Sequence, residues 1–516
     1  MMRVPSVLFF ALLGGCAAPV RFVDRPILWR DPDDAPIALP AHRQAGIQWT
    51  GFRDAVVYPA ERVFTLDYGE EAWNANALDE VPDSSWFVDV RRAGFDDEHR
   101  GGRPRSFTAD EITRGPFGDD PGPTAPFTII RGKTIGSTPG LVIEDARKQR
   151  YMFKLDPPGW RGMNTSTEVV ASRLAWASGW LVPAELIVDV RVEELILSPN
   201  ARGKNEWDEE IPFTREMLAE LLARTPRGPD GTVRVCAGRW IAGRNLGSFA
   251  YVGTRSDDAN DRIPHENRRD VRGFGVFAAW VNDIDTMENN TMDSYVGERG
   301  RGHVVHYQQD VGGSFGQFAA VPAEVWMGQE TFFMPGRILA SLATFGFTSR
   351  SWEGDERLAR RERLMAEYHE LGYFDDQGFD PRHWHPVLDN PAFVRATARD
   401  RYWGAKRILA FDQTELRAAV ALGRYEPKTA ERLFTILWNR REKILRAFLS
   451  DVAPLDYFHF ESNQLCFDDL WNQTERCITV DSKPGYHVVE LSALEHTVRV
   501  HFVAERERAH VIGIER

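Results

Sequence analysis

Five polar residues stand in otherwise apolar segments of this 516-residue chain: Lys154, Glu168, Asp285, Asn290 and Asp310. Lys154 lies in a short strand-like run, Glu168 opens the next helix-like run, and Asp310 ends another strand-like run. Phosphoryl transfer uses such a set: a lysine for the donor phosphates, a glutamate that positions it, an aspartate that orients the attacking hydroxyl, and an asparagine and a second aspartate for metal ions. We therefore predict that Lys154 and Glu168 bind a nucleotide. Asn290 and Asp310 are predicted to bind Mg²⁺ or Mn²⁺, and Asp285 to be catalytic.

Each of these residues also has an ordinary structural explanation. A strand lysine is most often a solvated edge charge, and a glutamate in the first turn of a helix stabilises the helix dipole. Asp285 and Asn290 fit a turn, and Asp310-Val311-Gly312 fits a β-turn. The order and the setting of all five residues together favour the catalytic interpretation.

The surrounding segments predict the elements that would position these residues. A helix is predicted from hydroxyl caps at 165–167 to Gly179, and a second, strongly apolar helix at 268–281. An Asp- and Asn-rich turn at 282–293 follows the second helix. Strands are predicted at 127–130, 141–143, 150–155, 185–192, 232–241 and 303–308.

These elements predict an α+β fold with a bilobal core. A small β-rich lobe is expected from residue 116 to about 243. A larger helical lobe is expected from there to 455, because the patterns at 322–448 are mostly helical. The last sixty residues return to alternating strands and predict a small β domain at 456–516. Residues 16–115 are expected to form a tether and a wrapping segment.

The interval from Asp285 to Asn290 is shared by protein kinases, HipA-type kinases and lipid-kinase-like enzymes. The segments Trp280-Val281-Asn282-Asp283-Ile284-Asp285 and His306-Tyr307-Gln308-Gln309-Asp310-Val311-Gly312-Gly313-Ser314-Phe315-Gly316 resemble a group of uncharacterised bacterial lipoproteins with a kinase-like core. The resemblance covers residues 125–450. It implies the kinase-like fold and the metal-dependent nucleotide site of the atypical kinase superfamily.

Two departures from the kinase pattern leave alternatives open. Asp283-Ile284-Asp285 stands where ordinary protein kinases have His-Arg-Asp, so Asp283 is a rival of Asp285 for the catalytic role. The glycines that follow the first predicted strand have a four-residue spacing, unlike the Gly-x-Gly-x-x-Gly of protein kinases. Among them, Gly132 and Gly136 are predicted to contact the nucleotide.

The N-terminus predicts export and lipidation. A short basic segment precedes an apolar run at 4–13, which is too short to cross a bilayer and is typical of a signal peptide at 1–15. Leu13-Gly14-Gly15-Cys16 resembles the bacterial lipobox, whose cysteine is acylated; the alternative is a plain signal peptide. We expect a lipid anchor in the cell envelope, and Ala17 follows the cysteine where an aspartate would suggest retention at the inner membrane. The predicted site is the outer membrane, facing the periplasm or the exterior.

Charge and cysteine content narrow the possible partners. A net charge of −13 argues against nonspecific binding of nucleic acid, which needs a basic surface. In an oxidising compartment Cys466 and Cys477 are close enough in sequence to form a disulfide, whereas Cys236 is predicted to be a buried thiol. The cysteines have no CxxC spacing and do not by themselves predict a metal site.

Three functions fit these observations. The first is a phosphotransferase that uses Mg²⁺ or Mn²⁺ with ATP, or with another phosphoryl donor because the periplasm is not supplied with ATP, on an unknown protein or small-molecule substrate. The second is a pseudokinase that acts as an envelope binding or scaffold protein, and the third is a nucleotidyl transferase. Buried carboxylates close to one another are costly without a cation, which favours an active site. The chain contains neither Gly-x-Ser-x-Gly nor His-Glu-x-x-His, which argues against a serine hydrolase and a zinc protease.

Overall fold

The computed structural model describes residues 20–43, 46–64, 69–92, 101–133, 138–205, 209–319, 321–332, 334–347, 352, 354–461, 463–481, 483–506 and 508–516. These residues form a mixed α+β structure with one large sheet and many helices. Cys16 and Gly136 lie outside the described residues. In the part of the chain that is described, no helix is both long and apolar enough to pass through a bilayer.

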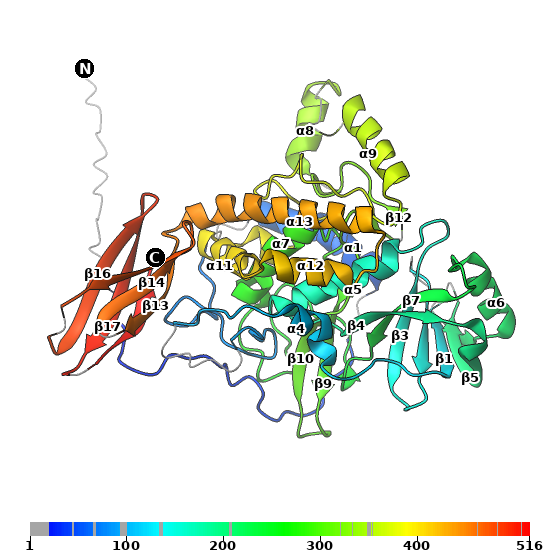
Figure 1. Ribbon diagram of the computed structural model, residues 1–516, viewed down its shortest axis with the longest axis horizontal. Helices are drawn as coiled ribbons and strands as arrows, with labels where there is room; N and C mark the ends of the chain where they lie inside the picture. Colours follow the sequence, from blue (N-terminus) through cyan, green and yellow to red (C-terminus); the bar gives the residue numbers. More distant parts are fainter. Residues whose placement is uncertain are drawn as a thin grey trace, which may run out of the picture.

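A seven-stranded sheet in the order β4-β7-β3-β2-β1-β5-β6 lies at one end of the molecule (Figure 1). Neighbouring strands are antiparallel, except that β1 and β5 are parallel. Lys154 of β3 is opposite Gly140 on one side and Cys236 on the other. Alternating apolar residues of the strands pack with α6 (Arg215–Arg224) into a core on one face. The strands are β1 (Phe127–Lys133), β2 (Gly140–Glu144), β3 (Arg150–Leu155), β4 (Glu185–Val190), β5 (Leu195–Lys204), β6 (Glu210–Pro212) and β7 (Val233–Arg239).

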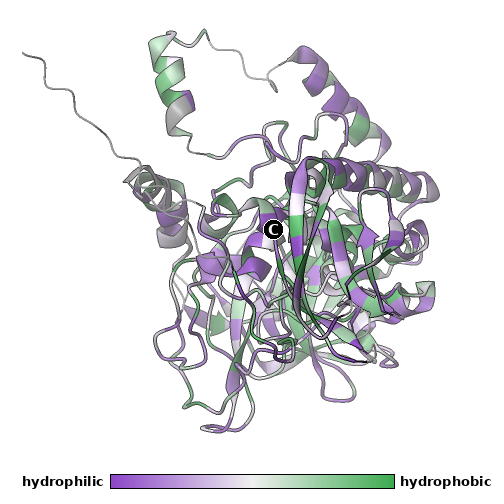
Figure 2. Cartoon of the chain, turned by 90° about the vertical axis from the view of Figure 1, so that its left-hand side faces the viewer, coloured by the Kyte–Doolittle hydropathy of each residue, from purple (hydrophilic) through white to green (hydrophobic). Residues whose placement is uncertain are grey.

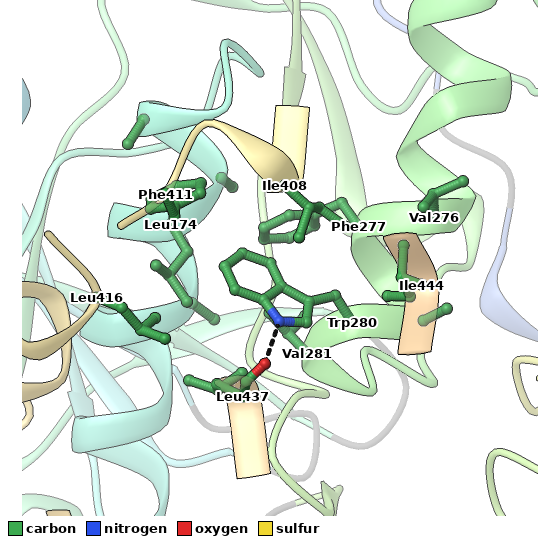
Figure 3. Close-up of a cluster of buried hydrophobic side chains, with 14 of the residues drawn as sticks. Leu174, Val276, Phe277, Trp280, Val281, Ile408, Phe411, Leu416, Leu437 and Ile444 are labelled. Atoms are coloured by element: carbon green, nitrogen blue, oxygen red, sulfur yellow. Dashed lines mark hydrogen bonds between the residues drawn. The ribbon is translucent and has the colours of Figure 1, made fainter. Parts of the chain in front are cut away.

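A large aromatic and aliphatic core joins five helices beside this sheet (Figures 1 and 3). Trp280 is fully buried in it, and its indole N–H donates to the Leu437 carbonyl at 2.8 Å. Leu174 and Ile408 pack around the same ring (Figure 3). The close packing fixes the beginning of α5 relative to the end of α7. The helices are α5 (Met163–Ala177), α7 (Arg269–Val281), α11 (Ala398–Leu409), α12 (Gln413–Ala421) and α13 (Pro427–Phe448).

A short antiparallel sheet in the order β10-β9-β8 pairs two strands that follow α7 in the chain with β8, which precedes it. The loop between α7 and β9 carries Asp283, Asp285 and Asn290, and β10 leads into Asp310. The β9-β10 hairpin therefore returns Asp310 to the loop. The strands are β8 (Arg244–Asn245), β9 (Thr291–Val296) and β10 (His303–Gln308), followed by the small pair β11 (Gln317–Phe318) and β12 (Val321–Pro322).

The last strands form two antiparallel three-stranded sheets, β13-β14-β15 and β16-β17-β18, at the end of the molecule opposite the seven-stranded sheet (Figure 1). Leu465, Phe467, Val498 and Val500 belong to the core that they share. The predicted disulfide joins Cys466 to Cys477 across β14 and β15. The strands are β13 (Leu455–Glu461), β14 (Gln464–Asp469), β15 (Thr474–Thr479), β16 (Gly485–Ala493), β17 (His496–Ala504) and β18 (Ala509–Glu515).

Two of the remaining helices, α8 and α9, project beyond α13 (Figure 1). Figure 2 shows that α8 is largely hydrophobic, whereas α9 is hydrophilic. Leu339 and Leu342 of α8 are exposed. The remaining helices are α1 (Ile47–Phe52), α2 (Tyr58–Phe64), α4 (Ala109–Arg114), α8 (Pro335–Ala343), α9 (Asp355–Glu367) and α10 (Pro391–Val394).

The predicted strands and helices of the first 310 residues lie within a few residues of those observed, but the predicted cap of α5 is wrong. The hydroxyl residues at 165–167 are buried inside the helix, which begins at Met163 after Gly162. The cap is Asp156, whose carboxylate accepts three backbone N–H groups of the first turn at 2.7, 2.9 and 3.1 Å. A negatively charged carboxylate interacts favourably with the positive end of the helix dipole. It accepts the free backbone N–H groups that the hydroxyl side chains at 165–167 were expected to bind.

Candidate active site

Lys154 forms a buried ion pair with Glu168. Its Nζ lies 2.7 Å from Glu168 Oε1, 3.3 Å from Asp310 Oδ1 and 3.7 Å from Glu185 Oε1. These four residues, here called the lysine cluster, come from β3, α5, the end of β10 and the start of β4. The Glu168 and Glu185 side chains are 3% exposed and that of Asp310 is 32% exposed. Asp310 is therefore the member of the cluster that a ligand can reach from solvent.

The loop that follows α7, here called the aspartate loop, lies beside Asp310. Asn282 adopts a left-handed conformation (φ 58°) and turns the chain out of the helix. The side-chain amide of Asn290 donates to the Asp285 carbonyl at 2.5 Å, which closes the predicted five-residue interval. The Asn290 carbonyl accepts the backbone N–H of Asp310 at 3.1 Å. Asn290 thus links Asp285 on one side to Asp310 on the other.

A pair of glycines separates the lysine cluster from the aspartate loop. A Cβ on Gly312 would lie 2.3 Å from Glu168 Oε1, and a Cβ on Gly313 would lie 2.8 Å from Asp285 Cβ and 2.9 Å from Asp283 Oδ1. Real Cβ atoms do not approach other atoms so closely, because van der Waals contact begins at larger separations. The absence of a side chain at both positions lets the lysine cluster and the aspartate loop lie close together.

Within the lysine cluster, Asp310 is the carboxyl group whose pKa lies below its usual range. Burial opposes the charge of Lys154, but Asp310 and Glu168 outweigh it and raise the pKa of the lysine well above its ordinary value. Burial raises the pKa of Glu168 strongly, and Asp310 adds to that rise against the attraction of Lys154. Burial would also raise the pKa of Asp310, but Lys154 and Lys133 outweigh it and hold that pKa below its usual range.

The aspartate loop has no comparable compensation. Burial raises the pKa of Asp283 well above its usual range, and repulsion from Asp285 and Asp310 adds to the rise. Burial also raises the pKa of Asp285 to about 6, against a hydrogen bond from Asn290. Asp283 Oδ1, Asp285 Oδ1 and Glu168 Oε2 have no hydrogen-bond partner among the described residues. Unpartnered buried carboxylate oxygens fit a divalent cation, whose charge would offset this repulsion.

Three residues of the site were not predicted from the sequence to take part in it. Glu185 belongs to the lysine cluster, and Cys236 lies opposite Lys154 in the sheet. Lys133 acts by its charge on Asp310 and on Lys154, and burial lowers its pKa. Cys236 is a buried free thiol, as expected, and burial raises its pKa well above the ordinary value. In the sequence, Glu185 and Lys133 are charged residues at the ends of apolar strands. Many exposed strand residues have the same pattern, so it does not indicate a functional site.

Gly132 has a packing explanation. It lies in β1, where a Cβ would stand 2.3 Å from the ring of Phe213. The small size of this residue is therefore required by the sheet core, independently of any phosphate. The second predicted glycine, Gly136, lies outside the described residues.

No protein-family model and no curated protein sequence matches the chain. Among solved structures, the crystal structure of the Golgi casein kinase aligns with 79% of this chain and 90% of its own chain, at 9% identity and a TM-score of 0.34. A TM-score this low does not establish a common fold. The lysine cluster and the aspartate loop are therefore the features from which a function can be inferred.

Proposed function

We propose that this protein is a metal-dependent phosphotransferase with a bilobal, kinase-like core and an additional C-terminal β domain. One observation supports the proposal above all: Lys154 Nζ lies 2.7 Å from Glu168 and 3.3 Å from Asp310, next to a loop that carries an Asp-to-Asn interval of five residues. A lysine, a helix glutamate and a metal-binding aspartate in contact are what a nucleotide triphosphate needs for its phosphates and its cation.

The residues have separate roles in the proposal. Lys154 holds the phosphates of the donor, and Glu168 fixes the direction of the lysine side chain. Asp310 and Asn290 hold Mg²⁺ or Mn²⁺, which when bound neutralises the negative charge of the phosphates. Gly132, near the end of β1, and Gly136 are proposed to contact the phosphates. The donor is ATP or another phosphoryl compound.

Exposure distinguishes the two candidates for the catalytic aspartate. Asp283 is 1% exposed and packs beneath Gly313, whereas Asp285 is partly exposed. A residue that orients an acceptor must touch it, so we assign the catalytic role to Asp285 and a positioning role to Asp283. The acceptor hydroxyl passes its proton to the Asp285 carboxylate while its oxygen bonds to phosphorus and the bond from phosphorus to the donor oxygen breaks. A pKa of about 6 keeps Asp285 mostly ionised at neutral pH and suits a base.

The proposal is tested first by binding. We expect Mn²⁺ with ATP to raise the melting temperature of the protein, by a stabilisation of about 2.7 kcal/mol when the ligand is at 100 times its Kd. Asp310→Asn should remove most of that rise, whereas Asp119→Asn, which changes a side chain that is 94% exposed, should not. Absence of any effect of Mn²⁺ and nucleotide on the wild type would refute the proposed site.

Turnover separates an enzyme from a pseudokinase. With a radiolabelled γ-phosphate donor, the wild type should transfer label to itself or to a supplied protein, and Asp285→Asn should bind Mn²⁺ and nucleotide but lose transfer. Binding without transfer by the wild type, over all donors tried, would support the pseudokinase alternative. That alternative requires buried, mutually repelling carboxylates to be retained without a chemical task.

We also propose that the protein is exported and anchored through a lipid on Cys16, in the outer membrane. Cells grown with a radioactive fatty acid should label the wild type, and Cys16→Ser should abolish the label and release the protein from the membrane fraction. Cys236→Ser is the matched control, because it removes another thiol and leaves the predicted lipobox unchanged. Labelling that persists in Cys16→Ser would contradict the anchor.

A further inference from the structure

Five side chains with metal-binding atoms share one face of the sheet β13-β14-β15. His459 is directly opposite Cys466, and Cys466 is directly opposite Cys477. Directly opposed residues of an antiparallel sheet point to the same face, as do residues two apart in one strand. Glu461 is two residues after His459 and Glu475 is two before Cys477, so all five belong to one strip. The intervening residues Leu465 and Phe467 point to the other face, into the core.

His459 is oriented as a metal ligand would be. Its side chain is buried, and Nδ1 donates to the Tyr457 carbonyl at 2.9 Å, so Nε2, which faces the glutamates, is the nitrogen that would bind a metal in place of a proton. Nε2 lies 3.3 Å from Glu461 Oε1 and 3.9 Å from Glu475 Oε1. A carbonyl that accepts from the outer nitrogen of a histidine is a common support of metal-binding imidazoles. One ligand atom each from His459, Glu461 and Cys466 lie within 4.8 Å of one another.

The candidate for a fourth ligand is Cys477, the disulfide partner of Cys466. The two cysteines form a disulfide, and a sulfur held in that bond is not a thiolate. Arg103 lies 3.5 Å from Glu475 and also binds Asp468, so Glu475 already has a cation partner. Glu461 has no such competitor among the contacts of the described residues and is the better carboxylate ligand.

We propose that reduction of the Cys466–Cys477 disulfide converts this strip into a Zn²⁺ site with His459, Glu461, Cys466 and Cys477 as ligands. A dithiol reductant supplies two electrons and two protons to the S–S bond, leaves as its own disulfide, and yields two thiols. Zn²⁺ then displaces the two thiol protons. Two sulfurs, one nitrogen and one carboxylate oxygen around a tetrahedral ion are a ligand set that zinc favours. The site arises from strand register, which explains why the spacing of the cysteines in the sequence does not indicate it.

The disulfide and the metal exclude each other in this proposal. The oxidised sheet is cross-linked by a covalent bond, and the reduced sheet by the ion, so that β14 and β15 stay joined in both states. The inference is independent of the proposed phosphotransferase activity, because the strip shares no residue with the lysine cluster or the aspartate loop.

Co²⁺ is the most direct probe, because thiolate ligands give it an intense near-ultraviolet charge-transfer band and a tetrahedral site gives it strong visible bands. The full chain is reduced with a dithiol, freed of reductant under argon and titrated with Co²⁺ alone. We expect both bands to saturate at one equivalent in reduced protein, to be absent in oxidised protein, and to disappear on addition of Zn²⁺. Cys236 is a thiol in both states, so a band that it caused would also appear in the oxidised protein. Equal bands in both states, or none in the reduced state, would overturn the proposal.

Two variants keep the test decisive if reduction disturbs the sheet. His459→Ala should weaken Zn²⁺ binding by more than the about 10–100-fold that loss of an outer-shell partner causes, whereas His496→Ala, on an exposed histidine of β17, should have no effect. Cys477→Ser cannot form the disulfide and should bind Co²⁺ without any reductant, with a weaker thiolate band from Cys466. If Cys477→Ser binds Co²⁺ only after treatment with a dithiol, the link between disulfide and metal is wrong.

Discussion

The two ends of α7 carry buried charges in opposite arrangements. At its start, Arg269 Nε lies 3.0 Å from Asp400 Oδ1, and Arg272 Nη1 lies 2.9 Å from Asp400 Oδ2. Arg269 also pairs with Asp79, which has a second partner in Arg399 at 2.5 Å. Each carboxylate of this group, here called the arginine network, is therefore held by at least two guanidinium groups.

At the other end of the helix the carboxylates are not paired with cations in this way. Asp283 and Asp285 face Asp310 and each has an oxygen without a partner among the described residues. Burial would raise the pKa of Asp79 too, but Arg269 outweighs it and lowers that pKa, whereas the pKa of Asp285 rises to about 6. Burial is common to both ends, so the difference lies in the partners. A paired cluster stabilises the fold, whereas an unpaired one is a site that a cation can stabilise.

The largest effect on stability is expected when an anion is removed from the arginine network. Asp400→Asn should lower the free energy of unfolding by about 3–5 kcal/mol, because Arg269 and Arg272 remain buried without their carboxylate. Urea denaturation at pH 8 measures the change. Asp285→Asn, the same substitution at the other end of α7, is the matched control and should cause no loss in metal-free protein. A loss below about 1 kcal/mol for Asp400→Asn would show that the network contributes little.

Removal of the cation from the lysine cluster should have a smaller effect that depends on pH. Lys154→Met leaves Glu168, Glu185 and Asp310 without their shared partner and should cost about 2–4 kcal/mol at pH 8. The cost should be smaller at pH 5, because the carboxylates, whose pKa values rise further without the lysine, can bind protons there. Denaturation curves at the two pH values give the comparison, with the exposed Lys148→Met as control. Equal costs at both pH values would argue against coupled carboxylates.

Gly312, which separates the lysine cluster from the aspartate loop, should tolerate no side chain. In Gly312→Ala the new Cβ would meet Glu168 Oε1 at 2.3 Å, and we expect a loss of stability of about 1–3 kcal/mol. The rise in melting temperature caused by Mn²⁺ should also be lost, since the new Cβ would displace Glu168 and press on Asp310 Oδ1, which lies 3.0 Å from it. Gly51→Ala is the control, because a Cβ there meets no atom within 4 Å. Normal Mn²⁺ stabilisation in Gly312→Ala would contradict the close approach of the lysine cluster to the aspartate loop.

The smallest effect is expected from neutralising Asp285 in the absence of metal. Its pKa in the folded protein, about 6, exceeds the ordinary value of 3.8, so the folded state keeps the proton longer as pH rises. Stability is therefore lost between about pH 4 and pH 6 and not regained above it. Asp285→Asn should be neutral near pH 4 and stabilising above pH 6, by about 1–2 kcal/mol after allowance for partial exposure. Added Mn²⁺ should narrow the difference, because the cation offsets the charge of Asp285 in the wild type; a difference that does not change with pH would contradict the raised pKa.

The local patterns predict the elements better than the contacts. Strands β3 and β10 lie where the alternation of apolar residues predicts them. The alternation is visible within each strand, because each strand buries one of its own faces. The pairing of Lys154 with Glu168 is predicted by the order of residue types alone. The Asp156 cap and Glu185 are not, since each acts on an element other than its own. Nothing in the segment 69–92 indicates that Asp79 pairs with Arg269, because that contact is decided by tertiary packing.

The contacts of Arg516 affect how the chain folds. Its guanidinium lies 2.9 Å from Asp456 and 3.4 Å from Asp79, and the backbone N–H of Ile514 donates to the Ala77 carbonyl at 2.8 Å. Strand β18 is thus joined to a segment from the first fifth of the sequence. Contacts of such long range close slowly, since the entropy of the intervening chain must be lost first. We expect the docking of β18 to be a late and slow step of folding, and the start of α7, held by the same Asp79, to become rigid only after it.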